Sequence, residues 1–406
     1  MHTPAVLAFV GTASAAAHIG SSSLFHNGWM PYEPAEITTY LNSTILTTPS
    51  TAEFTYPGTG LDGPKVHPVN GTNFDWWYFD AVSDDLPNGD LSSVIIVFYT
   101  LSQTAFFGQR QNDSVLAVSI AGTLRDGTRN YINLQPGEAT ITTLGDSSAG
   151  QWGSGPNNAS WSSSPDLRTW VVTSNNEIVN GSLTMTSIAP PHLPCGLPTP
   201  LATELIIPHV GWFSGAGYHD KNWGDQPLFD VEEYWYWGHG RLGPYSIVWF
   251  DAGSLVDGEE HFSAYVARDG RMISGSCIPG RSVVARPWDN ETVVPLHPPT
   301  NGSAPAEGFE IVFADVGGKE MRVNVTNVVA LTPLGAPVAR WTGTMEGGFE
   351  GERVWTGMAL YEEILGYRVV AWERARSGQH AGCCMAEPVL ARACRVARTA
   401  DRYACA

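Results

Sequence analysis

The sequence predicts an all-β protein built from two antiparallel domains. Short apolar segments alternate with Asn-Gly and Asp-Gly pairs, which suit the tight turns of β-hairpins because both central residues need a positive φ. No long segment repeats apolar residues with the 3.6-residue period of a helix. At 406 residues the chain also exceeds the length at which a single core normally stops growing. We therefore expect two domains of the sandwich or barrel type.

The expected strands follow these turns along the chain. Residues 76–82 form a first strand, which Asn88-Gly89 turns toward the apolar run 94–99. Asp126-Gly127 and Asp269-Gly270 predict two further hairpins of the same kind. Strands this short and this closely spaced favour antiparallel sheets in both halves of the chain.

The domain boundary is expected near the middle of the chain, where a proline-rich segment (190–200) interrupts the strand pattern. We expect one β domain over residues 25–235 and a second over 236–375, with a ligand cleft at their junction. Residues 376–406 show no strand pattern, and we assign them no function.

Composition excludes some partners and suggests a compartment. The net charge of −18 repels phosphate backbones and disfavours nucleic acid, and no apolar run is long enough to span a bilayer. Residues 1–17 resemble a signal peptide, and eight N-x-S/T sequons favour the secretory pathway, with glycans on exposed turns. If this leader is not functional, the protein is cytoplasmic. In an oxidising compartment Cys195 and Cys277 could pair. The sequons begin at Asn42, Asn70, Asn112, Asn158, Asn180, Asn290, Asn301 and Asn324.

An aromatic and polar stretch stands out at residues 217–237, where seven aromatic residues fall within 21 positions. It begins with Gly217-Tyr218-His219-Asp220-Lys221-Asn222-Trp223-Gly224-Asp225 and ends with Tyr234-Trp235-Tyr236-Trp237. This composition is too aromatic for a solvated loop and too polar for plain core. It predicts the wall of a pocket that stacks on a flat apolar molecule and offers it a few hydrogen bonds.

Two motifs near this stretch have structural explanations. Residues 238–243 match G-x-G-x-x-G, but a strand-like segment follows instead of the helix that a dinucleotide site requires, so we interpret the match as a hairpin turn. The spacing of His209, His219 and His239 matches no standard metal site, and we expect no metal.

The pair His219-Asp220 has two interpretations. A carboxylate could orient the imidazole for proton transfer. Adjacent residues on a strand point to opposite faces, however, so a structural role in a buried crossing is favoured. By the same alternation Trp76, Tyr78 and Asp80 share one face of their strand, and that face could supply a ring and a carboxylate to a cavity.

These motifs resemble a lipocalin-like family that includes carotenoid hydratases of the hydroxyneurosporene synthase type. Within it, the chain is more similar to fungal Diels–Alderases that form the decalin ring of polyketide–tetramic acid metabolites. The resemblance rests on residues 75–81, residues 217–224 and Trp341-Thr342-Gly343, and it spans about residues 25–375.

The resemblance implies a β-sandwich followed by a β-barrel, both lipocalin-like, with the substrate pocket between them. The implied reaction is a stereoselective intramolecular 4+2 (Diels–Alder) cycloaddition of a linear polyene carrying a tetramic acid, supplied by a polyketide synthase–peptide synthetase. The resemblance implies no cofactor. Because a pericyclic step moves no proton, such an enzyme would also need no catalytic triad or metal site. Catalysis would come from folding the polyene in a shaped cavity and from hydrogen bonds to the activated carbonyl.

The resemblance also suggests site residues. Trp223, Trp341 and Tyr236 are candidates for packing on the polyene, whereas Glu53, Asp80 and Asn222 are candidates for holding the tetramic acid. The expected catalytic residues are Trp223, Trp341, Asn222 and Asp80. The expected substrate contacts are Glu53, Trp76, Tyr78, Tyr236, Trp237 and His219.

Two other functions remain open at this level. A hydratase or isomerase that protonates a polyene or terpenoid needs an acid in the pocket, so Asp80 or Asp220 would have to lie there with a raised pKa. A carrier for a hydrophobic metabolite would bind a polyene without changing its rate of cyclisation.

Overall fold

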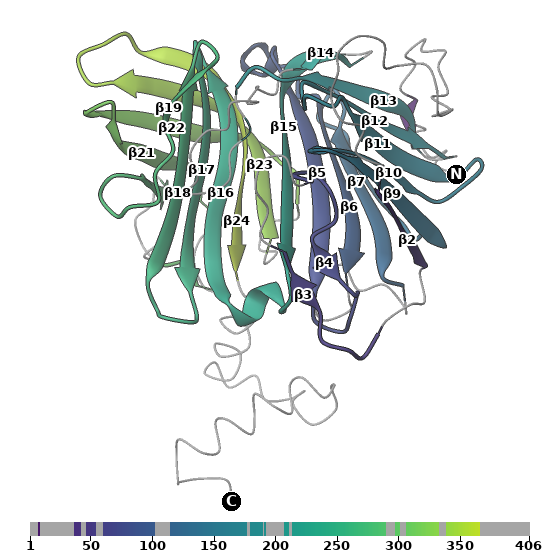
Figure 1. Cartoon of the computed structure of the whole chain (residues 1–406). Helices are drawn as coiled ribbons and strands as arrows, with labels where there is room; N and C mark the ends of the chain where they lie inside the picture. Colours follow the sequence, from purple (N-terminus) through teal and green to yellow (C-terminus); the bar gives the residue numbers. More distant parts are fainter. Residues whose placement is uncertain are drawn as a thin grey trace, which may run out of the picture.

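The computed structural model describes residues 7–8, 36–41, 46–53, 60–101, 114–176, 179–189, 191, 207–210, 213–289, 297–300, 306–332 and 338–365. Within these residues the chain forms three large sheets and one two-stranded sheet (Figure 1). Neighbouring strands are antiparallel except for β1, which runs parallel to β13. The prediction of an all-β, antiparallel fold is therefore confirmed.

The first half of the chain forms two facing sheets. We call the seven-stranded sheet the outer sheet and the six-stranded sheet the middle sheet. The outer sheet contains, in spatial order, β1 (Leu7–Ala8), β13 (Val179–Thr186), β12 (Thr169–Asn175), β11 (Asn158–Ser163), β10 (Ser147–Trp152), β9 (Glu138–Leu144) and β2 (Glu36–Leu41). The middle sheet contains β14 (Ile207–Val210), β15 (Phe213–Gly224), β5 (Phe74–Ser83), β6 (Ser93–Leu101), β7 (Leu116–Thr123) and β8 (Arg129–Leu134). A small hairpin pairs β3 (Thr51–Ala52) with β4 (Val66–His67).

The second half forms a nine-stranded sheet that curves until β20 packs against β17 and β18, which closes a barrel. The predicted domain boundary at residue 235 falls inside its strand β16. In spatial order the barrel contains β19 (Arg271–Ser274), β18 (Glu260–Arg268), β17 (Tyr245–Ser254), β16 (Glu232–Leu242), β24 (Trp355–Leu365), β23 (Val338–Phe349), β22 (Lys319–Ala330), β21 (Gly308–Val316) and β20 (Val283–Trp288). Short 3-10 turns, η1 (Leu86–Asn88) and η2 (Leu228–Asp230), are the helical elements of the described residues, and none could cross a membrane.

The three large sheets enclose three apolar cores, because both faces of the middle sheet are covered. One face packs against the outer sheet through rings such as Trp77, Trp152 and Trp161. The other face packs against the outside of the barrel wall, and Figure 1 shows β15 and β5 between the two halves. A third core fills the barrel. We call the second of these cores the interdomain layer.

The predicted hairpins form where glycine permits a left-handed backbone. Asp269 and Gly270 both have positive φ, at 46° and 81°, and join β18 to β19. Gly127 at φ 85° turns β7 into β8. The G-x-G-x-x-G match differs in detail from the prediction, because its first two glycines lie within β16 and Gly243 makes the turn into β17. A Cβ on Gly238 would lie 2.3 Å from the Trp249 ring, so this glycine makes room inside the barrel.

Other sequence predictions have mixed outcomes. Asn70, in the second sequon, is 9% exposed, and its side chain bonds to Thr48, Ser50 and Thr72. That sequon therefore does not lie on an exposed turn. Asn180 and Asn324 are exposed, but they lie within strands β13 and β22 and not on turns. Cys277 is disulfide-bonded. Its suggested partner Cys195 lies outside the described residues, as do residues 376–406 and all of the leader except residues 7–8.

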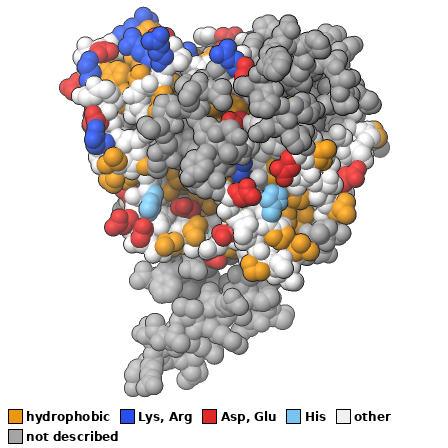
Figure 2. All heavy atoms as spheres, viewed as in Figure 1, with side chains coloured by type: hydrophobic (Ala, Val, Ile, Leu, Met, Phe, Trp, Pro, Cys, Tyr) orange, Lys and Arg blue, Asp and Glu red, His pale blue; other side chains and the backbone are white. Residues whose placement is uncertain are grey.

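The surface carries the excess acidic charge that the composition indicates. In the view of Figure 2, Lys and Arg side chains gather at the upper left, over the barrel. Asp and Glu side chains are spread across the lower part of both halves.

Candidate active site in the interdomain layer

Strands β5 and β15 form the centre of the site, and strand alternation sorts their side chains onto two faces. The strands are antiparallel neighbours in which Tyr78 lies opposite Asp220 and Asp80 lies opposite Tyr218. These four residues point toward the barrel, whereas His219 and Phe79 point toward the outer sheet. The motif singled out in the sequence is thus divided between two environments.

On the face toward the outer sheet, His219 is fully engaged. Its Nδ1 lies 2.9 Å from the carbonyl oxygen of Tyr78, and its Nε2 lies 2.9 Å from Oδ1 of Asp62. Because both partners are acceptors, both ring nitrogens carry a proton and the ring is an imidazolium. Burial opposes this charge, but the Asp62 carboxylate outweighs it and raises the pKa of His219. The ring also stacks on Phe79 at 4.2 Å.

The same face carries a second ion pair. The Lys221 ammonium donates to Asp75 and lies 4.0 Å from the centre of the Trp77 ring. The backbone N–H of Lys65 donates to the other Asp75 oxygen at 2.7 Å. Trp223 is the next residue of β15 on this face, and its Nε1 donates to the backbone carbonyl of Glu53 at 3.0 Å. These charges have partners, which is typical of a structural network.

On the face toward the barrel, Asp80 is completely buried and joins the two domains. Its Oδ2 accepts hydrogen bonds from the Tyr78 hydroxyl and from Nε2 of His239, each at 2.8 Å. Its Oδ1 has no hydrogen-bond partner among the residues that the structure describes. His239 comes from β16 of the barrel wall and stacks on Tyr218 of the middle sheet at 4.7 Å.

The barrel wall adds a buried ion pair next to these residues. Nε of Arg340 on β23 donates to Oε2 of Glu362 on β24 at 2.7 Å, and the Trp235 indole donates to Oε1 at 3.0 Å. The guanidinium carbon of Arg340 lies 5.7 Å from the Tyr78 ring centre. The Arg340 charge is therefore balanced by Glu362 and faces an aromatic ring of the other domain.

Asp220 is a carboxyl group whose pKa is strongly raised by burial. Its pKa is raised to about 7, mainly by burial and further by the Glu362 and Asp80 charges, with His219 and Asn222 acting in the opposite direction. Asn222 donates to its Oδ1 at 2.7 Å, which leaves Oδ2 to carry the proton. The residue keeps part of its surface exposed. Near neutral pH, Asp220 can therefore donate a proton to a molecule that reaches it.

We call Tyr78, Asp80, Tyr218, Asp220, His239, Arg340 and Glu362 the acid cluster. It lies in an apolar and aromatic layer, where Trp237 contacts Tyr78 and Tyr218 at ring distances of 5.4 and 5.5 Å. Asp220 is a carboxyl group that can be neutral, and Asp80 accepts hydrogen bonds from two donors. Together with the surrounding ring faces, this arrangement suits proton donation to an apolar substrate. Ring faces also stabilise a developing positive charge.

Comparison with known proteins shows the family to which this chain belongs. A family model described as Diels-Alderase-like matches residues 41–214. The quinolone epoxide rearrangement protein penF of Penicillium thymicola is 34% identical over 333 residues, covering 75% of this chain and 88% of the relative. The chain belongs to the Diels-Alderase-like family. The quinolone epoxide rearrangement protein asqO of Emericella nidulans is 32% identical, with 75% and 87% covered.

Other relatives within the Diels-Alderase-like family extend the comparison. The Diels-Alderase mycB of Thermothelomyces thermophilus is 27% identical over 52% of this chain and 53% of its own length. The crystal structure of CghA matches with a TM-score of 0.64 at 17% identity, covering 81% of this chain and 98% of CghA, and this likeness concerns the fold alone. Since these relatives are named as epoxide rearrangement proteins and Diels-Alderases, the chain is an enzyme of the pericyclase or isomerase type.

In this Diels-Alderase-like chain, the structure brings together about half of the site residues predicted from the sequence. The interdomain layer contains Trp76, Tyr78, Asp80, Asn222 and Trp237. Trp341 and Tyr236 lie inside the barrel core, on the other side of its wall. His219 faces the outer sheet and bonds to Asp62 in place of Asp220. Trp223 and Glu53 contact each other on that same face, so the predicted single pocket does not include these five residues.

Sequence reasoning missed His239, Arg340 and Glu362 as members of the cluster. His239 was considered only as a metal ligand, because residues 238–243 were interpreted as a hairpin turn, whereas the structure places His239 within strand β16. Arg340 directly precedes Trp341 on β23, so the two side chains point to opposite faces of the barrel wall. Trp341, which points into the barrel, was selected from the sequence, and not Arg340, which points toward the interdomain layer. No signal in the sequence links Arg340 to Glu362. In the described part of the chain no three His, Cys, Asp or Glu residues are grouped to hold a metal, and the expectation of no metal or cofactor stays a prediction.

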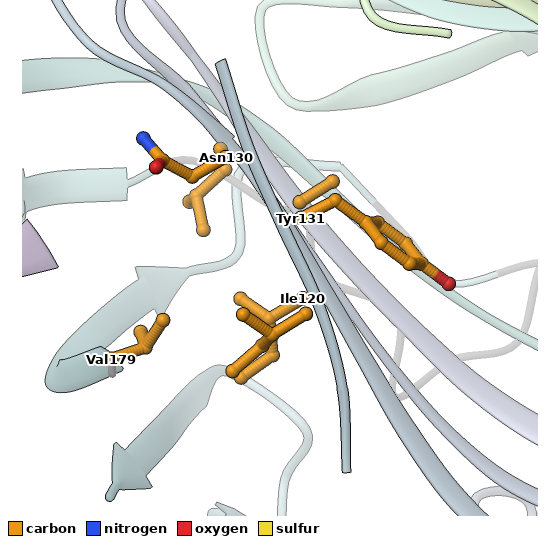
Figure 3. Close-up of a pocket in the computed structure, with 8 residues that line it drawn as sticks. Ile120, Asn130, Tyr131 and Val179 are labelled. Atoms are coloured by element: carbon orange, nitrogen blue, oxygen red, sulfur yellow. The ribbon is translucent and has the colours of Figure 1, made fainter. Parts of the chain in front are cut away.

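Two small hollows lie along β7 and β8 in the described part of the chain, and one of them is lined by Ile95 and Leu331 of the interdomain layer. The hollow drawn in Figure 3 has a volume of about 10 Å³. In that view Ile120, Val179 and Asn130 lie on one side of the central strand and Tyr131 lies on the other. This volume suits a single water molecule, and the Asn130 side-chain nitrogen is buried there without a partner. It is too small to hold a substrate.

Proposed function

We propose that the chain is an isomerase that opens an epoxide on an apolar substrate, with Asp220 as the proton donor. The observation that carries the proposal is a carboxyl group that is half protonated at about pH 7 inside an aromatic layer. A general acid works best when its pKa lies near the working pH. The names of the relatives penF and asqO, which rearrange quinolone epoxides, support this class of substrate.

The reaction follows from the placement of the proton. The Asp220 carboxyl transfers its proton to the epoxide oxygen while one carbon–oxygen bond breaks, and the bonding pair stays on oxygen. The cation left at carbon takes a hydride or alkyl group from the neighbouring carbon. The resulting oxygen-stabilised cation returns the hydroxyl proton to the Asp220 carboxylate and becomes a carbonyl. No atom is gained or lost, so the product is an isomer of the substrate.

The surrounding residues have defined tasks in this scheme. The faces of Tyr218 and Trp237 stabilise the cation before it rearranges. The apolar packing of the two sheets excludes water, which would otherwise trap the cation as a diol. Asp80 is held by Tyr78 and His239, and its free Oδ1 can accept a hydrogen bond from the polar part of the substrate.

The test uses Asp220→Asn with a quinolone epoxide as substrate. We expect turnover to fall by about 100-fold to 10,000-fold, the range for loss of a general acid. In the wild type, turnover should decline as the pH rises through about 7, because the donor loses its proton. Mass spectrometry in H₂¹⁸O should show an isomer without ¹⁸O.

The matched control is Asp225→Asn, which removes an exposed carboxyl just beyond β15. This variant should turn over like the wild type. Full activity of Asp220→Asn, or a diol formed by addition of H₂¹⁸O in place of the isomer, would reject Asp220 as the acid of an isomerisation.

A second candidate is the 4+2 cycloaddition of a polyene bearing a tetramic acid, delivered by a polyketide synthase–peptide synthetase, to give a decalin. The similarity to the Diels-Alderases mycB and pyiF favours it. In this reaction the neutral Asp220 carboxyl would donate a hydrogen bond to the dienophile carbonyl and keep its proton, and the layer of rings would hold the folded polyene.

The two candidates differ in proton movement. Epoxide opening predicts a slower rate in D₂O, because the Asp220 proton is transferred to the epoxide oxygen as the carbon–oxygen bond breaks. Cycloaddition predicts little solvent isotope effect and an unchanged mixture of stereoisomers in D₂O. Conversion of a polyenoyl tetramic acid to one decalin isomer, with no conversion of the quinolone epoxide, would favour the second candidate.

A further inference from the structure

A second group of buried acids lies inside the barrel, away from the acid cluster. Asp251 on β17, Tyr236 on β16 and Glu363 on β24 are direct neighbours across three strands. Strand alternation directs all three inward, since Tyr236 belongs to the barrel core and its strand neighbour Trp237 belongs to the interdomain layer. Tyr236 therefore has a carboxyl group on each side.

Asp251 has one oxygen that is satisfied and one that is not. Its Oδ2 accepts from the backbone N–H of Ala285 at 2.9 Å and from Arg286 at 2.7 Å. Its Oδ1 has no hydrogen-bond partner within the described part of the chain, although the residue is 0% exposed. Burial raises the pKa of Asp251 to about 6. A buried acceptor without a donor is unfavourable, so this oxygen has the capacity to bind a donor from outside the chain.

Glu363 is the less satisfied of the two acids. Among the described residues no hydrogen bond or ion pair of its carboxyl group is found, and no neighbouring charge or hydrogen bond contributes to its pKa. Burial alone raises its pKa to about 7. The side chain keeps part of its surface exposed, so a ligand can reach it.

The remaining groups at this end of the barrel are already paired. Glu260 accepts two hydrogen bonds from Arg286 at 3.0 Å, one from the Tyr234 hydroxyl at 3.0 Å and one from His297 at 2.8 Å. With Nε2 of His297 donating to Glu260, its Nδ1 is free to accept from the Tyr236 hydroxyl at 3.3 Å. Burial and the Arg286 charge lower the pKa of His297, so this ring is neutral.

The charges at this end favour a cation. Asp251, Glu260 and Glu363 supply three carboxyl groups against the single guanidinium of Arg286, so the group is negative when Glu363 is ionised. The ring of Tyr236 lies between Asp251 and Glu363 in the sheet, and the centre of the Phe309 ring lies 5.3 Å from the centre of the Tyr236 ring. An ammonium group has three N–H donors and is attracted to a ring face.

We infer that this end of the barrel binds a small primary amine, with its ammonium group over Tyr236 and between Asp251 and Glu363. The ammonium N–H groups supply the donors that Asp251 Oδ1 and the Glu363 carboxylate lack. The apolar part of the amine packs on the neighbouring rings. The site lies on the inner side of the barrel wall, whereas the acid cluster lies on the outer side, so the inference is independent of the proposed isomerase function.

The experiment is calorimetric titration of the full chain with 2-phenylethylamine at pH 8.0 and pH 5.5. We expect binding at pH 8.0 and at least tenfold weaker binding at pH 5.5, where Glu363 is protonated. The alcohol 2-phenylethanol has the same ring without the charge and should not bind. Trimethyl(2-phenylethyl)ammonium keeps the charge without N–H donors and should bind at least tenfold more weakly than the amine.

Variants locate the site. Glu363→Gln keeps the size of the side chain and should weaken amine binding at least tenfold at pH 8.0. Glu346→Gln removes an exposed acid on the adjacent β23 and should have no effect. Asp220→Asn should also leave amine binding unchanged. Absence of binding at millimolar amine, equal binding by Glu363→Gln, or loss of binding in Asp220→Asn would overturn the inference.

Discussion

The two faces of β15 differ in how completely their charges are paired. On the face toward the outer sheet, His219 and Lys221 each have a carboxylate partner, Asp62 and Asp75. On the face toward the barrel, Asp220 has an amide donor and no cation, and burial keeps it partly protonated at neutral pH. Residues that are adjacent in the sequence therefore serve different purposes, one stabilising the sandwich and the other available for chemistry.

The largest expected effect comes from breaking the paired face. Asp62→Ala leaves the buried His219 imidazolium without its carboxylate, and we expect a loss of about 3–5 kcal/mol in the free energy of unfolding. Urea unfolding at pH 6 measures it. Turnover per folded molecule should remain at the wild-type level. A stable variant with lost turnover would reverse the assignment of the two faces.

The pH dependence of this pair has a defined sign. The folded pKa of His219 is raised above the ordinary 6.5, so its contribution to stability is complete below about pH 6. The contribution is lost as the pH rises through the folded pKa. In Asp62→Ala this loss should be smaller, and the unfolding midpoints of the variant and the wild type should converge at high pH.

Asp220→Asn should have the opposite effect on stability. The folded pKa of about 7 lies above the ordinary 3.8, so the unfolded chain ionises first and wild-type stability falls between about pH 4 and pH 7. Replacing the acid by a neutral amide removes this penalty. We expect a gain of about 1–2 kcal/mol at pH 8, after allowance for partial exposure, and none at pH 4. A loss at pH 8 would show that the carboxylate is a structural group.

A smaller effect is expected from the charge that faces Asp220 from the barrel. Glu362→Gln removes a negative charge that raises the pKa of Asp220. The alkaline limb of the turnover profile should move toward acid by roughly one pH unit, equivalent to about 1.4 kcal/mol. Glu346→Gln, on an exposed position of β23, serves as the control and should leave the profile in place. An unmoved limb in Glu362→Gln would mean that Asp220 does not control the rate.

The smallest effect concerns Trp223, on the paired face. Trp223→Phe keeps a ring and removes the hydrogen bond to the Glu53 carbonyl. We expect a loss of about 0.5–1 kcal/mol in unfolding free energy, because the bond is partly exposed, and no change in turnover. A large drop in turnover would restore Trp223 to the role that the sequence suggested.

The sequence predicted the fold through local signals. Turns such as Asp269-Gly270 need only the backbone preference of two residues, and the alternation of β5 separates Tyr78 from Phe79 without tertiary information. The site could be predicted only in part, because its partners are distant. Asp62 lies 157 residues before His219, and Asp80 lies 159 residues before His239. Trp341 was expected in the pocket from the family resemblance, and alternation alone could not correct this, because it does not tell which face of a strand becomes the inside of a barrel.

The glycines beside His239 give the barrel wall an unusual mechanical property. At Gly238 and Gly240 the wall is bare backbone, against which the Trp249 ring and the Met345 sulfur rest directly from inside. A change in the bulk of either residue would push on the chain segment that carries the His239 imidazole. Engineering the hidden lining of the barrel could therefore adjust the His239–Asp80 contact by displacement, with every residue of the acid cluster left intact.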